Sequence, residues 1–400
     1  MDHKAELLSP AGDRERLEMA LLYGADAVYL AGRAYGMRAA SANFSDGELA
    51  DAVVFAHEKG AKVYVTCNTL PLETELEALP GYLGFLQEAG VDALIIADLG
   101  VLELAKKHAP KVARHVSTQF GVINSAAANA LYALGADTVV LARETKLEDI
   151  RRIRANTPPE LRLEAFVHGA MCVSFSGRCL LSNYLTGRDA NRGECAQPCR
   201  WKYHLVEEKR PGQYFEISED GGTYIFNSRD MCMIGHLPEL LEAGVSSFKI
   251  EGRMKSAYYA AVVTNAYRHA LEAALAGKPL DPVWAAETET VSHRPYSTGF
   301  YFGTPGQHYA EASYSATADV VAVVEDCDPE GNALLTQRNK FCRGDKLELL
   351  LPGEKPLPFT ADRLCDAEGQ EIEDTRRAMM PFRMRLPAAA PKNAVVRRKR

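Results

Sequence analysis

The stretch Tyr23-Gly-Ala-Asp-Ala-Val-Tyr-Leu-Ala31 places a glycine shortly before a run of apolar residues. A glycine that ends a helix and is followed at once by a buried strand is the usual turn from helix to strand in α/β proteins. The same arrangement returns in Ala89-Gly-Val-Asp92, Leu134-Gly-Ala-Asp137 and Ala243-Gly-Val-Ser246. The recurrence predicts a unit of one helix and one strand that is repeated along the chain.

Short apolar runs alternate with amphipathic stretches from the first residues onward. Eight such runs lie at 6–9, 27–31, 62–66, 93–97, 114–118, 138–142, 163–167 and 247–251. Strands that are apolar on both faces belong to a parallel sheet covered by helices. Eight units predict an α/β fold, a (β/α)8 TIM-like barrel over residues 1–277, which a helix from about Ser256 to Ala276 closes.

The pattern changes after residue 277. Glycine and proline separate short alternating runs at 318–325, 333–336 and 345–350, which predict a small all-β module. We therefore expect a linker at 278–309 and a small β-barrel-like domain at 310–400. That domain ends in a basic tail, either a solubilising terminus or an electrostatic contact for RNA, made of Lys392 and Arg397-Arg-Lys-Arg400.

Composition and charge narrow the class of protein. The chain has 400 residues, of which 47% are hydrophobic and 25% charged, as in ordinary globular proteins with more than one core. A net charge of -7 argues against a protein that coats nucleic acid without specificity. The chain starts with Met-Asp-His-Lys and has no long uninterrupted apolar run, so we expect a cytoplasmic protein that does not enter a membrane.

Five of the nine cysteines fall in an oversized excursion at about 169–241, namely Cys172, Cys179, Cys195, Cys199 and Cys232. Clustered thiols can bind a soft metal, form disulfides or supply a nucleophile, and a reducing compartment favours metal over disulfides. Only Cys195 and Cys199 have the short spacing of a zinc knuckle. Thiols dispersed over several loops fit a [4Fe-4S] cluster, but spacing alone leaves zinc open.

Active sites of barrels lie at the carboxyl ends of the strands, so the polar residues just after each apolar run are the candidates. Arginines there can form bidentate pairs with an anionic substrate. His168 directly precedes the cysteine excursion and is either a general base, a cluster neighbour or an orienting residue. We assign catalytic roles to His168, Gln119 and Glu251, and substrate binding to Arg38, Asn68, Arg143 and Arg253.

Several common signatures are missing. The chain has neither GxGxxG nor GxxxxGK[ST], so a nucleotide cofactor is not supported. HExxH and GxSxG are also absent. A peptidase would therefore need an unfamiliar Cys/His arrangement that uses His168.

The run Glu164-Ala-Phe-Val-His-Gly-Ala-Met-Cys172, with Gly177, Cys179 and Ser182 after it, resembles the signature of the peptidase U32 family, the collagenase-like proteins. Similar segments cover essentially the whole chain and include Glu6-Leu-Leu-Ser-Pro-Ala-Gly12, Cys195-Ala-Gln-Pro-Cys-Arg-Trp201, Lys249-Ile-Glu-Gly-Arg253 and Arg338-Asn-Lys-Phe341. The resemblance implies one of several activities. The family name records proteolysis, whereas other branches hydroxylate tRNA, 23S rRNA or a ubiquinone precursor without molecular oxygen.

The resemblance also implies a [4Fe-4S] cluster held by four cysteines. Cys172, Cys179 and Cys195 match ligand positions throughout the family. The fourth differs between branches, and we take Cys232 as first choice and Cys199 as the alternative.

The β-module and the Arg338-Asn-Lys-Phe341 run resemble the branch that forms 5-hydroxyuridine at the wobble position of tRNA. In that branch prephenate is the implied hydroxyl donor. We therefore expect an enzyme with tRNA as partner and prephenate as a small anionic co-substrate, with a protein partner of the same family as a further expectation. The alternatives are a collagenase-like peptidase and a noncatalytic RNA-binding or assembly scaffold with a structural cluster.

Overall fold

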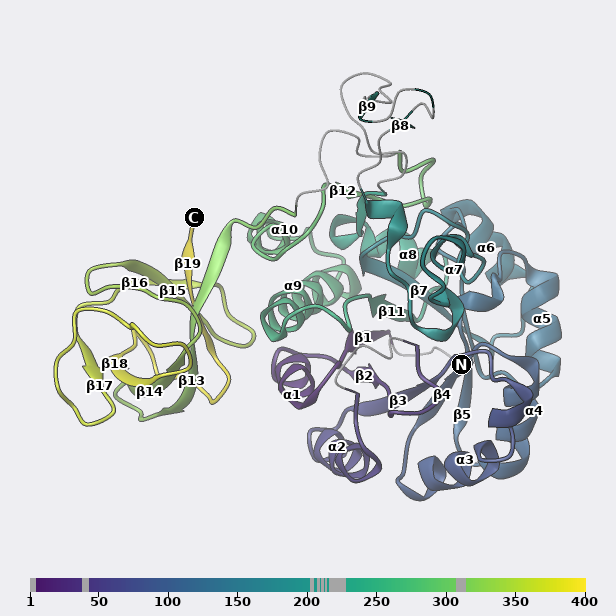
Figure 1. Cartoon of the computed structure of the whole chain (residues 1–400), viewed down its shortest axis with the longest axis horizontal. Coiled ribbons are helices and arrows are strands. Elements are labelled where there is room, and N and C mark those ends of the chain that lie inside the picture. Colours follow the sequence, from purple (N-terminus) through teal and green to yellow (C-terminus); the bar gives the residue numbers. More distant parts are fainter. Residues whose placement is uncertain are drawn as a thin grey trace.

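The computed structural model describes residues 5–37, 43–201, 205–206, 209, 212, 214–215, 228–306 and 314–400. Its larger part is a closed parallel barrel surrounded by helices (Figure 1). The eight barrel strands are β1 (Glu6–Pro10), β2 (Ala27–Leu30), β3 (Lys62–Cys67), β4 (Ala93–Ile96), β5 (Ala113–Val116), β6 (Thr138–Val140), β7 (Arg162–Gly169) and β11 (Ser247–Ile250). Because β11 pairs with both β1 and β7, the sheet has no free edge among these strands. The predicted TIM-like barrel is confirmed.

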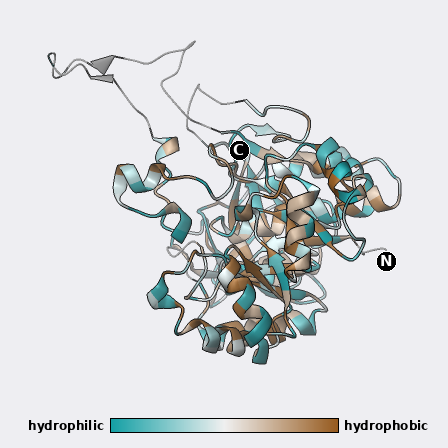
Figure 2. Cartoon of the chain, turned by 90° about the vertical axis from the view of Figure 1, so that its right-hand side faces the viewer, coloured by the Kyte–Doolittle hydropathy of each residue, from teal (hydrophilic) through white to brown (hydrophobic). Residues whose placement is uncertain are grey.

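Helices link these strands in sequence. They are α1 (Arg14–Leu22), α2 (Asp46–Glu58), α3 (Leu79–Glu88), α4 (Leu99–His108), α5 (Ser125–Ala133), α6 (Leu147–Ala155), α8 (Leu237–Glu242) and α9 (Ala257–Leu275). The strands are almost wholly buried, with hydrophobic residues along them in the middle of the barrel (Figure 2). The long helix α9 presents the buried residues Tyr259, Val263 and Tyr267 to the barrel.

The recurring glycine turn explains how each unit is joined to the next. Gly24, Gly90, Gly135 and Gly244 all have positive φ, between 81° and 102°, which only glycine adopts at no cost. In three of these turns the following aspartate accepts a backbone hydrogen bond from the neighbouring strand. The pairs are Asp26 with Leu7, Asp92 with Val63 and Asp137 with Arg114, each at 2.8 Å. The glycine-aspartate motif therefore ends a helix and fixes the next strand beside its neighbour.

Between β7 and β11 the chain makes a long excursion over the carboxyl end of the barrel. It contains the short helix α7 (Leu181–Thr186), three 3-10 turns at 190–192, 198–200 and 234–236, and the strand β10 (Asp230–Cys232). A two-stranded ribbon, β8 (Leu205–Val206) with β9 (Tyr214–Phe215), also belongs to it. β10 pairs antiparallel with β7 and carries β12 (Tyr296–Ser297) as its other neighbour. A buried ion pair of Asp230 with Arg294, at 2.7 Å, fixes this extension.

The C-terminal part is an antiparallel sheet of seven strands. They are β13 (Ala318–Cys327), β14 (Asn332–Gln337), β15 (Lys346–Leu350), β16 (Leu357–Thr360), β17 (Leu364–Asp366), β18 (Pro381–Arg385) and β19 (Val395–Lys399). Their order in the sheet is β16-β15-β19-β13-β14-β18-β17. The predicted all-β domain is confirmed. Within the stretch expected to be a linker, α10 (Pro282–Thr288) packs against α9, and β12 joins the barrel sheet.

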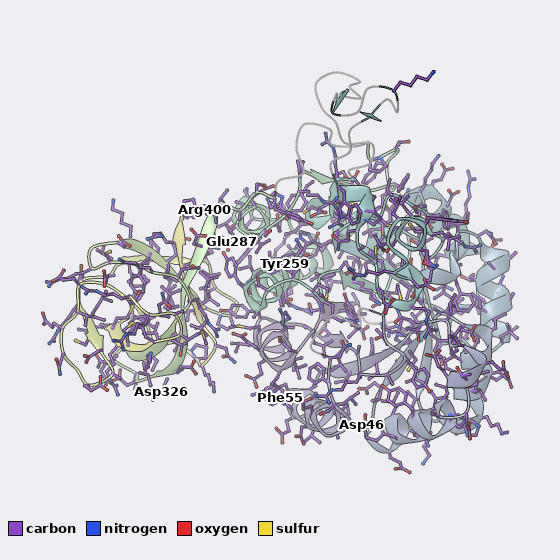
Figure 3. The ribbon with its side chains drawn as sticks, in the orientation of Figure 1. Asp46, Phe55, Tyr259, Glu287, Asp326 and Arg400 are labelled. Atoms are coloured by element: carbon purple, nitrogen blue, oxygen red, sulfur yellow. The ribbon has the colours of Figure 1, made fainter. Side chains whose placement is uncertain are left out.

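The boundary between the two parts is packed and partly charged. Tyr23, which follows α1, donates to the carbonyl of Leu350 at 2.9 Å. Arg397, which is fully buried, bonds to Glu287 of α10 at 2.6 Å and to Glu348 of β15 at 2.8 Å. Glu287 and the last residue of the chain, Arg400, mark this boundary in Figure 3.

The structure differs here from the expected basic tail. Residues 395–399 form the strand β19 inside the sheet, because Val395, Val396 and Arg397 are buried between β13 and β15. The exposed cations are paired as well. Arg398 bonds to Asp345 at 3.0 Å, Lys399 to Glu348 at 2.7 Å and Arg400 to Asp319 at 2.7 Å. The segment therefore offers little free positive charge.

None of the described helices has the length and apolar character needed to cross a membrane.

Candidate functional site

A cavity of about 220 Å³ opens at the carboxyl ends of the barrel strands, beneath the cysteine excursion. Its walls come from both parts. The strand ends contribute Asn68, Gln119, Arg143, Glu251 and Arg253, all of which were predicted as site residues. Arg38, predicted to bind substrate, lies outside the described residues.

One side of the cavity is cationic. The Arg143 guanidinium lies 4.0 Å from the centre of the Phe166 ring, and its Nη2 is 3.4 Å from Glu251 Oε2. Arg253 is 4% exposed and donates to Thr66 Oγ1 at 3.0 Å. Both side chains are held by neighbours from other strands, so their positions are fixed before any ligand arrives.

Lys249 is a third cation in this wall, which the reading of the sequence missed. Its ammonium is 2.7 Å from Glu164 and 4.7 Å from the centre of the Tyr29 ring. Lys249 and Glu164 lie inside the barrel because inward and outward residues alternate along a strand. The available signal was a lysine two residues before Glu251 in an otherwise apolar run, on the same face of the strand.

Amide side chains also line the cavity. Asn68 accepts a hydrogen bond from the Met37 backbone at 3.0 Å and donates its Nδ2 to Gln119 Oε1 at 2.8 Å. Ser117 donates to the same Gln119 oxygen at 3.2 Å. The Gln119 carbonyl is thus occupied, which orients the amide group against the cavity wall.

Four of the five clustered cysteines line the cavity, namely Cys172, Cys179, Cys195 and Cys199. Burial raises the pKa of the Cys199 thiol, Arg200 lowers it, and the other three thiols raise it further because negative charges nearby repel. The backbone N–H of Gln197 donates to the Cys195 sulfur at 3.4 Å. All nine cysteines are free thiols.

The segment that carries these cysteines is tied to the barrel. Glu144 accepts hydrogen bonds from the Ser176 backbone at 2.9 Å and from its hydroxyl at 3.1 Å. A side chain at Gly177 would lie 2.8 Å from the Gln119 backbone, so only glycine permits this close approach. Arg192 bonds to Glu75 at 2.6 Å on the other side of the opening. These contacts fix the thiols over the strand ends.

Cys232, our first choice for the fourth ligand, lies elsewhere. It ends β10, and its sulfur is 3.7 Å from Tyr267 Oη and 3.9 Å from Thr288 Oγ1. Burial raises its pKa. It is not among the residues that line the cavity, so the structure places Cys199 and not Cys232 in the same space as the other three cysteines.

His168 also lies outside the lining of the cavity. It is 1% exposed, with Nδ1 3.3 Å from Tyr267 Oη and Nε2 3.4 Å from Tyr296 Oη. Burial lowers its pKa to about 3, so the imidazole is neutral at physiological pH. The geometry makes His168 a packed, hydrogen-bonded residue of β7 that lies beside Cys232 of β10.

The donor set suits a soft metal or an iron-sulfur cluster, because four thiols share one enclosed space. Among the described residues, no three His, Cys, Asp or Glu side chains already stand in the geometry of a bound metal ion. The four thiols therefore fit such a group chemically. They would have to move closer together to coordinate it. The cations in the same lining suit a small carboxylate or phosphate.

Two family models match the chain. Peptidase family U32 matches residues 12–311, and the peptidase family U32 C-terminal domain matches residues 316–397. A protein of Bacillus subtilis named tRNA hydroxylation protein P1 is 37% identical over 96% of this chain and 92% of its own length. Its counterpart in Escherichia coli, tRNA hydroxylation protein P, is 36% identical over 92% of this chain and 91% of its own. A Porphyromonas gingivalis protein named Collagenase is 33% identical over 74% of this chain and 73% of its own.

Proposed function

The chain belongs to peptidase family U32, and from this premise we propose that it is an enzyme that hydroxylates tRNA, forming 5-hydroxyuridine at the wobble position. The observation that carries the proposal is the cavity, whose lining contains four thiols and three cations. The near full-length similarity to two proteins named for tRNA hydroxylation supports the choice of substrate.

Cys172, Cys179, Cys195 and Cys199 are the residues that would hold a [4Fe-4S] cluster. Their shared cavity and the mutual effect of their charges on Cys199 support this set over one that includes Cys232. A cluster bound there would supply redox or Lewis-acid chemistry next to the substrate. Arg178 and Arg200 lie in the same loops and would offset part of the negative charge of four thiolates.

The chain's own cations would bind the co-substrate. Arg143 and Arg253 present guanidinium groups to the cavity, and Lys249 adds an ammonium group at its wall. Carboxylates pair well with such groups in a partly dry space, which suits a dicarboxylate such as prephenate. Glu251, bonded to Arg143, faces the same space and would exchange a proton with the bound ligand.

Two exposed aromatic rings, close in sequence to the lining residues Leu181 and Cys199, suit an unpaired nucleotide. Tyr184 on α7 is 84% exposed and Trp201 is 42% exposed, on two segments that contact each other. Exposed aromatic rings beside arginines are the usual platform for unstacked RNA bases. A uridine in a single-stranded anticodon loop could reach the cavity without melting a duplex.

A peptidase is the second candidate, supported by the relative named Collagenase. Its chemistry finds no support in the geometry. Among the residues that the structure describes, no histidine lines the cavity. His168 is packed against Tyr267 and Tyr296, and burial lowers the pKa of its imidazole. A cysteine nucleophile there would lack its general base.

The first test is the metal content of protein purified without oxygen. We expect about four irons and four sulfides per chain in the wild type and in Cys232→Ala, and loss of both in Cys172→Ala and Cys199→Ala. Retention by Cys199→Ala with loss in Cys232→Ala would overturn the ligand set. If the purified protein holds stoichiometric zinc, or no metal after reconstitution, the proposal of a [4Fe-4S] cluster is overturned.

The second test concerns the reaction. In a strain that lacks the endogenous activity, the wild-type gene should restore the hydroxylated uridine in digested tRNA, and Cys199→Ala should not. A folded Cys199→Ala protein that restores the nucleoside would point to a scaffold with a dispensable cluster. Cleavage of gelatin by the wild type, lost on substitution of a cavity cysteine, would favour the peptidase.

A further inference from the structure

A second hollow, which we call the arginine groove, lies in the C-terminal domain. Its volume is about 640 Å³, and β14, β16, β17 and β18 line it. Three arginines stand in its walls, Arg363, Arg383 and Arg385, together with the half-buried ring of Phe359. Asp362 is the one acidic residue in that lining.

The direction of two arginines follows from the strand that carries them. Along β18, Phe382 and Met384 are buried in the core of the domain, and Arg383 and Arg385 are exposed on the other face. Residues two apart on one face of a strand are separated by about 7 Å. That spacing is comparable to the distance between successive phosphates of an extended RNA strand.

These arginines keep much of their charge available. Within the described residues the Arg385 side chain has no hydrogen bond or ion pair, and the Arg383 side chain has only a 3.5 Å bond to the Ala367 carbonyl. Arg363 pairs with Glu371 at 2.9 Å in an exposed contact, which a ligand can replace at little cost. The cations of β19, in contrast, are all engaged.

The charge of the whole chain makes the groove distinctive. Residues 1–315 hold 31 basic and 39 acidic side chains, whereas residues 316–400 hold 15 and 14. An RNA drawn to the barrel must overcome the negative charge of that part. The positive charge of the groove would offset part of that repulsion. Because the C-terminal domain stands to one side of the barrel (Figure 1), a ligand that contacts both the groove and the barrel must be long.

We infer that the arginine groove docks the sugar-phosphate backbone of tRNA outside the anticodon loop. The inference rests on the proposed function and adds a contact at a distance from the cavity. Arginine is the side chain best suited to bidentate contact with phosphate, and such contacts set position and affinity without reading sequence. Phe359 would pack against a ribose or a base at the same place.

The test compares Arg383→Gln/Arg385→Gln with a matched control, Arg343→Gln/Arg377→Gln. The control removes two exposed arginines of the same domain that do not line the groove. Binding of labelled full-length tRNA and of an isolated anticodon stem-loop is measured at several salt concentrations. We expect the groove variant to bind full-length tRNA about tenfold more weakly, with a log-log salt slope smaller by about 1 to 2. The control variant should match the wild type with both RNAs.

Binding of the stem-loop is the internal reference. If both variants bind it like the wild type, and only the groove variant loses affinity for full-length tRNA, the inference is supported. If the two variants bind full-length tRNA with equal affinity and equal salt slope, the inference about the arginine groove is overturned. The proposed function is unaffected by that result. Failure of the wild type to bind either RNA would overturn both. If polyglutamate binds the wild type as tightly as full-length tRNA does, and the groove variant loses that binding, the groove recognises an acidic peptide and the inference is overturned.

Discussion

At the scale of single residues, Lys249 and Glu164 form the most enclosed ion pair of the barrel interior. We expect Lys249→Met to lower the free energy of unfolding by about 3 to 5 kcal/mol, because it leaves the buried Glu164 carboxylate without its cation and, among the described residues, with only the Ser247 hydroxyl as donor. Urea unfolding at pH 7 measures this. The double variant Glu164→Gln/Lys249→Met should recover most of the loss. If the double variant is as unstable as the single one, the pair does not act as a unit.

His168 predicts a dependence of stability on pH. Its pKa is about 3 in the folded protein, against about 6.5 in the unfolded chain. As pH falls from 6.5 toward 3, the unfolded state takes up a proton that the folded state does not, so stability falls by up to about 1.4 kcal/mol per pH unit from this residue. Above pH 6.5 the contribution is constant.

Urea unfolding of wild type and His168→Asn between pH 4.5 and 7.5 checks this. The slope of stability against pH should be smaller in the variant by about one proton over the acidic half of that range. His115, also buried with a lowered pKa, remains in both proteins and cancels in the comparison. Identical slopes would mean that His168 is protonated, or accessible, in the folded state.

Much of the site was open to prediction from sequence, because the residue after each barrel strand faces the same opening. Asn68, Gln119, Arg143, Glu251 and Arg253 do gather there. Lys249 was missed because its place inside an apolar run gives no local sign that its charge is compensated from another strand. The choice between Cys199 and Cys232 depends on the path of a long loop, and that path is not encoded in local spacing.

At the scale of elements, the eight barrel strands and α9 could be predicted because turn chemistry and periodicity are local. β19 could not, since four consecutive basic residues are typical of a solvated terminus. Arg397 is buried there only because Glu287 and Glu348 supply charge from α10 and β15. A partner so distant in sequence leaves no trace in the pattern around Arg397.

Arg397 therefore predicts a specific weakness. Arg397→Gln leaves the buried Glu287 carboxylate without its cation, whereas Glu348 keeps Lys399, and should lower the free energy of unfolding by about 3 to 5 kcal/mol. Arg400→Gln, which breaks only an exposed pair with Asp319, should leave stability unchanged. Denaturant unfolding of the two variants checks both. Equal stability of the variants would show that Arg397 contributes no more than a surface pair.

At the scale of the whole molecule, the two parts share a core. Val323, Leu350 and Val395 of the C-terminal sheet belong to a single buried cluster of the barrel. That cluster also contains Tyr23, at the end of α1, and Val262 of α9. We expect barrel and sheet to unfold together. In a Trp201→Phe background the remaining tryptophan is Trp284 of α10, stacked on His269 with ring centres 3.8 Å apart. Its fluorescence and the far-UV circular dichroism should then show one coincident transition in urea. Two separated transitions would mean that the shared core does not couple the parts.

The closure of the barrel by β11 delays the pairing of β1 during synthesis of the chain. Glu6 and Ser247, side by side across β1 and β11, are 241 residues apart in the chain. On a ribosome that adds roughly 5 to 20 residues per second, β1 waits about 10 to 50 s for its second neighbour, and all the clustered cysteines emerge during that wait. The nascent chain thus exposes two open sheet edges and its clustered thiols at the same time. Any chaperone that protects the open edges would therefore meet a chain whose reactive thiols are also exposed.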